Sequence, residues 1–311
     1  MSLTKELLNN TYDVKYSKAI TTNSTFTYEE LVFGIKNYTS LLNKYKNKVD
    51  RVGIIVKDNI NENTICLVLA LLDLKIQPII INEKIENIEE ILENEDIKIS
   101  FYESAKKPTC LKKCDLVIDE EYKYFSTARP YYNVRNFYKI ANHDWFLNSI
   151  KSKKENENCV CKLYDKKDNE TTKVNIYEED LKLYGTEFAK LTYNGRLQVA
   201  ITTLPLYTKE GLLYATRALS NDMHLICLSG KSASKKFSKI KKENPLVISF
   251  DDNMLEYIVD NYKNKDFDFL SIEKVIPNVK KENMELLNEL LKKYNYSEKN
   301  NDLEKTLKLE K

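Results

Sequence analysis

A polar stretch between two apolar segments carries the residue types that could bind an anion. The segment Cys159–Ile176 reads CVCKLYDKKDNETTKVNI, which predicts a buried strand, a polar loop, and a second strand from about Val174. In the loop, the hydroxyl groups of Thr171 and Thr172 and the ammonium group of Lys173 could donate hydrogen bonds to a phosphate. A phosphate cradle also needs close backbone N–H groups, which glycine permits, and this loop has no glycine. Its acidic residues would repel a polyphosphate, so we expect a weak phosphate site at best.

The cysteines and histidines do not show the spacing of a metal site or a catalytic triad. The pairs Cys110–Cys114 and Cys159–Cys161 do not form two CxxC motifs, and His143 and His224 lie far from them in the sequence. We therefore expect no bound metal, and we interpret the cysteines as ordinary thiols in a reducing compartment. His224 stands in an apolar strand and is interpreted as a packed strand residue rather than as a base.

The composition excludes several classes of protein. Hydrophobic residues make up 42% of the 311 residues, which is enough for a substantial core, and the formal net charge is only +2. A balanced charge without a basic, aromatic groove argues against nucleic-acid binding. The longest apolar run, Ile65–Leu72, is too short for a membrane span, and the first residues show no signal-peptide core. We therefore expect a cytoplasmic protein without a membrane span.

Apolar runs alternate with amphipathic segments along most of the chain. Arg51–Val56 and Ile76–Ile81 are apolar throughout, as expected of strands covered on both faces. Thr64–Leu74 is apolar on nearly every side and predicts an enclosed helix, whereas Thr27 and Glu30 have the spacing of a capping box. The other expected strands are Ile97–Tyr102, Asp115–Ile118, Leu197–Thr202, His224–Leu228, Val247–Phe250 and Ile272–Ile276, and further expected helices are Tyr177–Leu191, Gly211–Leu219, Ala233–Lys241 and Glu282–Lys293.

This alternation predicts an α/β fold. Strands followed by helices pair in parallel through right-handed crossovers, which gives doubly wound, mostly parallel sheets with helices on both faces. The irregular, charged run Lys151–Asn158 is typical of a linker or surface loop. We therefore predict a first α/β subdomain at 1–150, a second at 151–296, and a charged C-terminal tail at 297–311.

Several phrases of the sequence resemble a known family. They are TFTYEEL with DRVGIIVKDN, the long segment from Cys66 to Phe101, TTLPLYTKEGLL at 202–213, and the segment from Phe269 to Glu298. In this order and spacing they resemble the large N-terminal domain of the adenylate-forming superfamily, which includes acyl-CoA synthetases, adenylation domains of peptide synthetases and luciferases. The resemblance implies two stacked sheet units.

The resemblance also identifies the loop at 164–174 with the family's phosphate loop. That loop reads approximately Y-T-S-G-T-T-G-x-P-K-G, and its three glycine positions fall on Lys167, Glu170 and Val174. Its lysine falls on Lys173, preceded by two threonines. The resemblance therefore implies that Thr171, Thr172 and Lys173 are the remnants of a site for ATP and magnesium, and the missing glycines imply that this site has degenerated.

A second phrase corresponds to the family's pocket for the carboxylate substrate. The family reads L-P-L-F-H-x-x-G, which places Tyr207, Thr208 and Gly211 as candidate substrate-binding residues, with Thr208 in place of the histidine. The family's glycine-rich adenine segment falls on Pro277–Val279, which has no glycine, and its Y-G-x-T-E segment falls loosely on Tyr294–Glu298. The sequence ends before the family's ribose-binding aspartate and its C-terminal domain with the catalytic lysine.

These departures lead to two hypotheses of function. The first is a degenerate, acyl-CoA synthetase-like protein that has lost adenylation, has no catalytic residue and no cofactor, and binds a partner protein or an acyl or aryl carboxylate. The amphipathic pattern persists throughout the chain, which favours a scaffold over a decaying gene. The alternative is an active AMP-forming acid ligase that uses ATP and magnesium through an atypical loop and is completed by a separate C-terminal domain.

Overall fold

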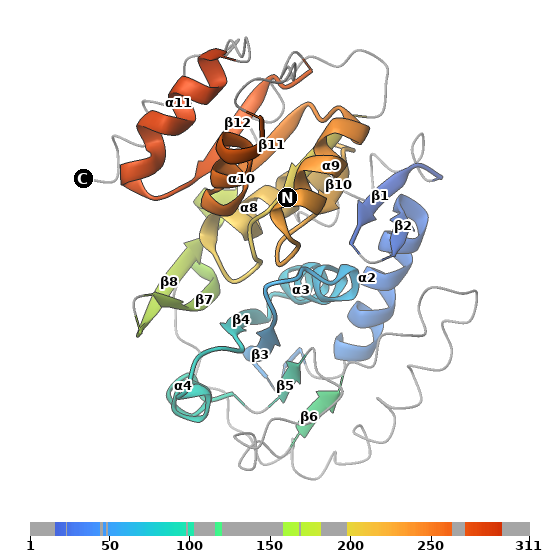
Figure 1. Cartoon of the computed structure of the whole chain (residues 1–311). Helices are drawn as coiled ribbons and strands as arrows, with labels where there is room; N and C mark the ends of the chain where they lie inside the picture. The colour runs from blue at the N-terminus through green and yellow to red at the C-terminus, as the bar shows by residue number, and fades with distance from the viewer. Residues whose placement is uncertain are drawn as a thin grey trace.

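The computed structural model of the chain contains two six-stranded sheets, with helices between them and on their outer faces (Figure 1). It describes residues 16–22, 24–43, 46–47, 49–97, 99–102, 116–119, 158–167, 169–181, 198–262 and 271–293. The predicted tail at 297–311, the linker 151–157, the segment Tyr294–Glu298 and most of the predicted helix Tyr177–Leu191 lie outside these residues.

The first sheet, called sheet B, has the strand order β6-β5-β3-β4-β7-β8. Its strands are β3 (Arg51–Val56), β4 (Gln77–Asn82), β5 (Ile99–Tyr102), β6 (Leu116–Asp119), β7 (Cys159–Lys167) and β8 (Glu170–Tyr177). All neighbouring strands run parallel except β8, which pairs with β7 in the antiparallel direction. Helix α3 (Glu62–Leu74) connects β3 to β4, and helix α4 (Ile88–Asn94) connects β4 to β5, so this part of the chain has the predicted alternation.

The two faces of sheet B are covered by different helices. Ile79 and Ile81 of β4 pack with the apolar residues of α4, whereas Ile80 packs in the same cluster as α3. Successive residues of a strand point to opposite faces, so a strand that is apolar at every position needs cover on both sides. The predicted doubly wound arrangement is therefore confirmed.

The second sheet, called sheet A, has the order β12-β11-β9-β10-β1-β2. Its strands are β1 (Lys18–Thr21), β2 (Thr25–Thr27), β9 (Val199–Thr202), β10 (His224–Cys227), β11 (Val247–Asp251) and β12 (Lys274–Asn278). Its helices are α8 (Lys209–Ser220), α9 (Ala233–Glu243), α10 (Asp252–Tyr262) and α11 (Met284–Lys293), with the short 3-10 helix η4 (Lys281–Asn283) before α11. Among the described strand pairs of this sheet, β1 and β2 run antiparallel and the others run parallel.

The two sheets exchange strands across the predicted boundary at residue 150. The β1–β2 hairpin, near the start of the chain, pairs with β10 and so belongs to sheet A. The β7–β8 hairpin, just after the boundary, pairs with β4 and so belongs to sheet B. Each sheet therefore contains strands from both sides of residue 150. The division into subdomains at 1–150 and 151–296 stays a prediction.

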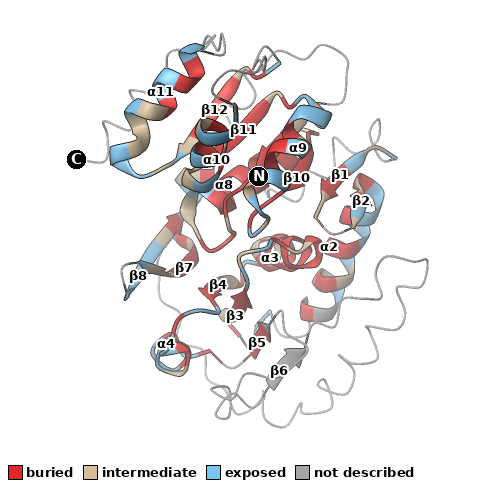
Figure 2. Ribbon diagram, in the orientation of Figure 1, coloured by how far each residue is buried: buried red, intermediate tan, exposed pale blue. Residues whose placement is uncertain are grey.

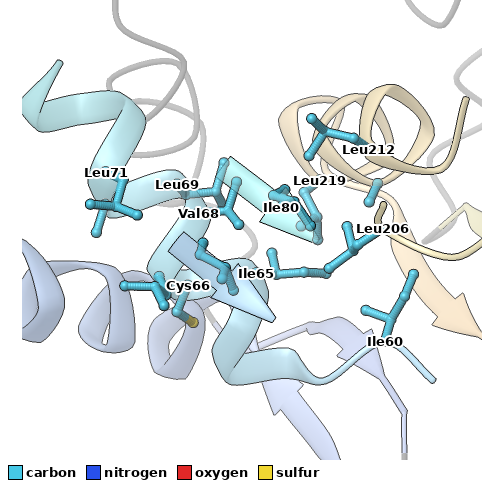
Figure 3. Packing of buried hydrophobic residues seen from close by; sticks show 14 of the residues in the cluster. Ile60, Ile65, Cys66, Val68, Leu69, Leu71, Ile80, Leu206, Leu212 and Leu219 are labelled. Atoms are coloured by element: carbon cyan, nitrogen blue, oxygen red, sulfur yellow. The ribbon is translucent and has the colours of Figure 1, made fainter. Parts of the chain in front are cut away.

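Three helices form the layer between the sheets. Helix α2 (Tyr28–Leu42) begins at the predicted capping box, in which Thr27 accepts from the N–H of Glu30 and Glu30 accepts from the N–H of Thr27. Helices α2, α3 and α8 share one buried cluster with residues of both sheets. Figure 3 shows part of this cluster, with Leu206 and Leu212 beside Ile65 of α3 and Ile80 of sheet B.

Hydrogen bonds join α2 to α8 and to the residue that precedes β10 of sheet A. The buried hydroxyl of Tyr28 donates to the carbonyl oxygens of Leu219 and Met223, at 3.2 and 2.8 Å. In Figure 2, α3, β3, β4 and β10 are almost entirely buried, whereas β8 is largely exposed. The described part of the two sheets therefore has a continuous apolar interior, with β8 at its margin.

Several described helices of this glycine-poor chain end with a non-glycine residue in the left-handed region. Lys75 at the end of α3 has φ 58°, and Asp222 and Asn244 adopt similar angles after α8 and α9. The N–H of Ile76 donates to the carbonyl of Leu71 at 3.0 Å, which satisfies the helix end in the usual way. Side chains other than glycine disfavour this conformation because Cβ crowds the backbone.

Replacing Lys75 by glycine should therefore stabilise the protein by about 0.5–1 kcal/mol. Lys75→Ala keeps the Cβ and is the matched control. Urea denaturation of the three proteins measures the effect. A glycine variant that is no more stable than the alanine variant contradicts the prediction.

Candidate functional site

The stretch predicted as a phosphate loop is a tight β-hairpin. Strand β7 continues to Lys167 and β8 begins at Glu170, and these two residues pair directly. The prediction of a polar loop that resumes as a strand near Val174 is therefore wrong at its ends. Asn169, in the turn, has φ 66°, as two-residue hairpin turns require, and Thr171 and Thr172 favour strand. The asparagine was the sequence signal for this turn.

The three predicted cofactor-binding residues do not converge on one point. The hydroxyl of Thr171 contacts Asn87 Oδ1 at 3.2 Å, and the hydroxyl of Thr172 donates to the backbone oxygen of Asp165 at 3.3 Å. Thr172 lies on the face of β8 opposite to Thr171 and Lys173, because side chains alternate along a strand. The Lys173 ammonium group contacts Glu95 Oε1 at 2.6 Å and lies 5.6 Å from the centre of the Tyr164 ring.

Glu95 at the end of α4 is the centre of a polar cluster that sequence reasoning missed. Its Oε1 atom accepts from the Tyr164 hydroxyl at 2.5 Å as well as from Lys173. Its Oε2 atom accepts from Lys162 Nζ at 2.9 Å and from Arg51 Nη1 at 3.1 Å. The carboxylate side chain is only 4% exposed and Lys162 only 5%, whereas Lys173 is 44% exposed. We call Arg51, Lys162, Tyr164 and Lys173 the Glu95 cluster.

The cluster fixes the charge of Glu95. Burial alone would raise the pKa of this carboxyl, but the hydrogen bonds from Lys162, Lys173 and Tyr164 outweigh it and lower the pKa from 4.5 to about 2. Burial and the neighbouring Glu95 raise the pKa of Tyr164 to about 12. Glu95 is therefore an anion and Tyr164 a neutral hydrogen-bond donor over the ordinary pH range.

The predicted substrate residues come together in one turn at the start of α8. Thr208 is the N-cap: its hydroxyl accepts from the N–H of Gly211 at 3.1 Å and donates to the Pro205 carbonyl at 2.8 Å. A Cβ on Gly211 would lie 2.0 Å from that carbonyl oxygen. The glycine is thus required by the close approach of the helix to the preceding turn, and the threonine by the cap. Both residues have structural reasons for their identity.

Tyr207 connects this turn to sheet B. Its hydroxyl donates to Asp58 Oδ1 at 2.6 Å, and Lys84 Nζ contacts Asp58 Oδ2 at 2.5 Å. Burial and the bond to Asp58 raise the pKa of Tyr207, and the negative charge of Asp165 adds to the effect. Asp58 and Tyr207 lie in the loops that follow β3 and β9, and Asp165 lies near the end of β7. Ligands of α/β sheets usually bind at such carboxyl ends of strands. An acyl or aryl carboxylate would have to displace Asp58 from Tyr207 to bind there.

Lys173 and Tyr207, one from each set of predicted residues, lie on different faces of sheet B. Tyr207 belongs to the central cluster between the sheets, together with Leu163 of β7. Tyr164, which pairs with Lys173, belongs to the outer cluster under α4. The structure therefore does not bring Lys173 and Tyr207 into one site.

The described cysteines and His224 are buried and packed within the fold. Cys66, Cys159, Cys161 and Cys227 are buried thiols outside any disulfide, and among the described residues no group of three or more His, Cys, Asp or Glu side chains could hold a metal ion. Cys110, Cys114 and His143 lie outside the described residues. His224 Nε2 is hydrogen-bonded to Thr21 Oγ1 at 2.8 Å, which confirms the interpretation of His224 as a packed strand residue.

The stability of the protein should depend on the titration of His224. Burial and the positive charge of Lys18 lower the pKa of His224 from 6.5 to about 4. Between these values the unfolded chain binds a proton that the folded chain does not, so the free energy of unfolding should fall as the pH falls. The full change is about 3 kcal/mol. His224→Gln keeps a donor near Thr21 and should flatten the pH profile from 6.5 to 4 in denaturant titrations; an unchanged profile contradicts the assignment.

Among the helices that the structure describes, none is long and apolar enough to cross a membrane. Searches with protein-family models gave no match, and no curated protein matches the sequence. The fold, in contrast, matches solved structures.

One such structure is the unliganded O-succinylbenzoate coenzyme A synthetase (MenE) of Bacillus subtilis, which matches with a TM-score of 0.68 and 15% sequence identity. The match covers 94% of this chain and 59% of that chain. The N-terminal domain of FACL13 from Mycobacterium tuberculosis matches with a TM-score of 0.66, 13% identity, 93% of this chain and 73% of that one. VinN, solved in complex with 3-methylaspartate, matches with a TM-score of 0.67, 10% identity, and 95% and 76% coverage.

These identities are too low to show more than architecture, and the chain spans only 59% of the length of the MenE structure. The strand order, the helical layer between the sheets and the likeness to an N-terminal domain agree with the resemblance found in the sequence. The chain therefore has the fold of the large N-terminal domain of the adenylate-forming enzymes.

Proposed function

We propose that this chain is a non-adenylating protein of acyl-CoA synthetase-like fold, which acts in the cytoplasm as a binding scaffold for a partner protein. The observation that carries the proposal is the environment of Lys173. Its ammonium group is bound by Glu95 of the same chain, at the position where the resemblance places the lysine of a phosphate loop. A nucleotide phosphate would have to compete with a buried carboxylate for this cation.

The backbone around Lys173 supports the same conclusion. From the pair Tyr164–Lys173 to the pair Lys167–Glu170, β7 and β8 pair residue by residue, so the hairpin has a regular ladder in place of a glycine-rich loop. N–H groups that bond to a neighbouring strand cannot turn toward a phosphate. Phosphoryl chemistry depends on charged groups positioned toward the transition state, and Lys173 of this hairpin is held by Glu95.

The test of this proposal is isothermal titration of the protein with ATP in the presence of magnesium. We expect no measurable heat of binding. Exchange of labelled pyrophosphate into ATP, with a panel of carboxylic acids, should likewise give no signal above background. Micromolar binding of ATP that disappears in Lys173→Ala would overturn the proposal and favour an active AMP-forming ligase.

A retained carboxylate site would centre on Tyr207. Acyl and aryl carboxylates should therefore be titrated against the wild type and against Tyr207→Phe, which keeps the ring and removes the donor. Binding that is lost in the phenylalanine variant would show that a carboxylate competes with Asp58. If no carboxylate binds to either protein, the proposed role of the scaffold is to bind a partner protein.

A further inference from the structure

The Glu95 cluster has the construction of a ligand site. Four donors from β3, β7 and β8 converge on the two oxygens of one carboxylate, which comes from a separate element, the end of α4. Arg51 and Lys162 deliver their hydrogen bonds to Oε2, while Tyr164 and Lys173 deliver theirs to Oε1. Proteins recognise bound carboxylates in the same way, with a charged donor on each oxygen.

We infer that Arg51, Lys162, Tyr164 and Lys173 form a carboxylate-binding site, and that Glu95 is its intramolecular ligand. This inference does not depend on the proposed loss of adenylation. ATP and magnesium test the loss of adenylation, whereas acetate tests the carboxylate site. The site would accept a small monocarboxylate of the size of the Glu95 side-chain end whenever Glu95 does not occupy it.

The sheet holds the receptor in place without Glu95. Lys162 and Tyr164 lie on one face of β7, two residues apart, and Lys173 is the cross-strand partner of Tyr164. Arg51 starts β3, which is separated from β7 by β4 alone. All four residues therefore come from paired strands, which fix their backbone positions whether or not Glu95 is present.

The turn at the end of α4 positions Glu95, the intramolecular ligand, over the sheet. The N–H of Ile97 donates to the carbonyl of Leu92 at 2.8 Å, and Asp96 takes the left-handed conformation with φ 51°. This turn directs Glu95 onto the sheet. Attachment to the chain gives the Glu95 carboxylate a high effective concentration, so the wild type should not respond to free carboxylate in solution.

Glu95→Ala removes the CH₂COO⁻ end of the side chain, which corresponds to acetate. We expect this variant to melt several degrees below the wild type in sodium chloride, and sodium acetate of equal ionic strength should restore a large part of the difference. Formate should restore less because it fills less of the space, and benzoate should restore nothing because its ring does not fit. The wild type should melt at the same temperature in all four salts.

A second variant decides the outcome if Glu95→Ala does not fold in chloride. Folding induced by acetate alone would then support the inference. If acetate does not induce folding, the double variant Glu95→Ala/Lys162→Met removes the buried ammonium charge that Glu95 no longer compensates and leaves three donors for acetate. An equal melting temperature of a folded variant in acetate and in chloride would overturn the inference, as would rescue by sulfate equal to that by acetate, which indicates ionic strength or nonspecific anion binding.

Discussion

Glu95→Gln should destabilise the chain by about 3 kcal/mol, although the side chain keeps its size. Lys162 is only 5% exposed, and the variant leaves its ammonium group without the carboxylate that compensates its charge at 2.9 Å. The pKa of Glu95 gives the same magnitude, because lowering it from 4.5 to about 2 corresponds to about 3 kcal/mol in favour of the charged form. Urea denaturation at neutral pH measures the loss.

The double variant Glu95→Gln/Lys162→Met separates the charge from the packing. Methionine fills most of the volume of the lysine stem without a charge, so the double variant should recover a substantial part of the loss. Glu86→Gln is the matched surface control: Glu86 pairs with Lys166 at 2.7 Å but is 87% exposed, so its replacement should have little effect. Equal effects of Glu86→Gln and Glu95→Gln would show that the buried cluster has no special role.

Most elements of this fold could be predicted because their signals are local. The apolar run Ile76–Ile81 and the enclosed helix at Thr64–Leu74 differ from the observed β4 and α3 by a residue or two at their ends. The capping box at Thr27 and Glu30 was also visible, since its two partners are three residues apart. Patterns of this kind depend on the periodicity of one element and on its caps.

The assignment of hairpins to sheets could not be predicted in the same way. The β1–β2 hairpin pairs with β10, about 200 residues later, and no local pattern marks that contact. The Glu95 cluster was missed for the same reason, because Glu95 is one of many glutamates in a charged helix and its partners lie between 44 and 78 residues away. Only the three-dimensional pairing of β3, β7 and β8 distinguishes it.

The predicted substrate residues show how a motif can be kept for structural reasons. Thr208 and Gly211 lie in one turn, where Thr208 caps the helix and Gly211 allows a close approach to Pro205. Tyr207, in contrast, donates a hydrogen bond to the charged group of Asp58, in the loop that follows β3. A test that separates stability from ligand binding is therefore most informative at Gly211.

Gly211→Ala should destabilise the protein by about 3 kcal/mol. The added Cβ would lie 2.0 Å from the Pro205 carbonyl oxygen, so the first turn of α8 has to move away from the preceding backbone. That movement introduces overpacking strain of about 1–3 kcal/mol and weakens the Thr208 cap by about 1 kcal/mol. Thermal and urea denaturation measure the sum.

Two neighbouring variants resolve the causes of this loss. Thr208→Ala removes the cap bond to Gly211 without a clash and should cost about 1 kcal/mol, whereas Glu210→Ala, at an exposed position of the same turn, should be nearly neutral. Glu210→Ala should therefore be the most stable of the three variants, Thr208→Ala less stable, and Gly211→Ala the least stable. If Gly211→Ala is as stable as Glu210→Ala but no longer binds a carboxylate that the wild type binds, the glycine serves a pocket and the packing explanation fails.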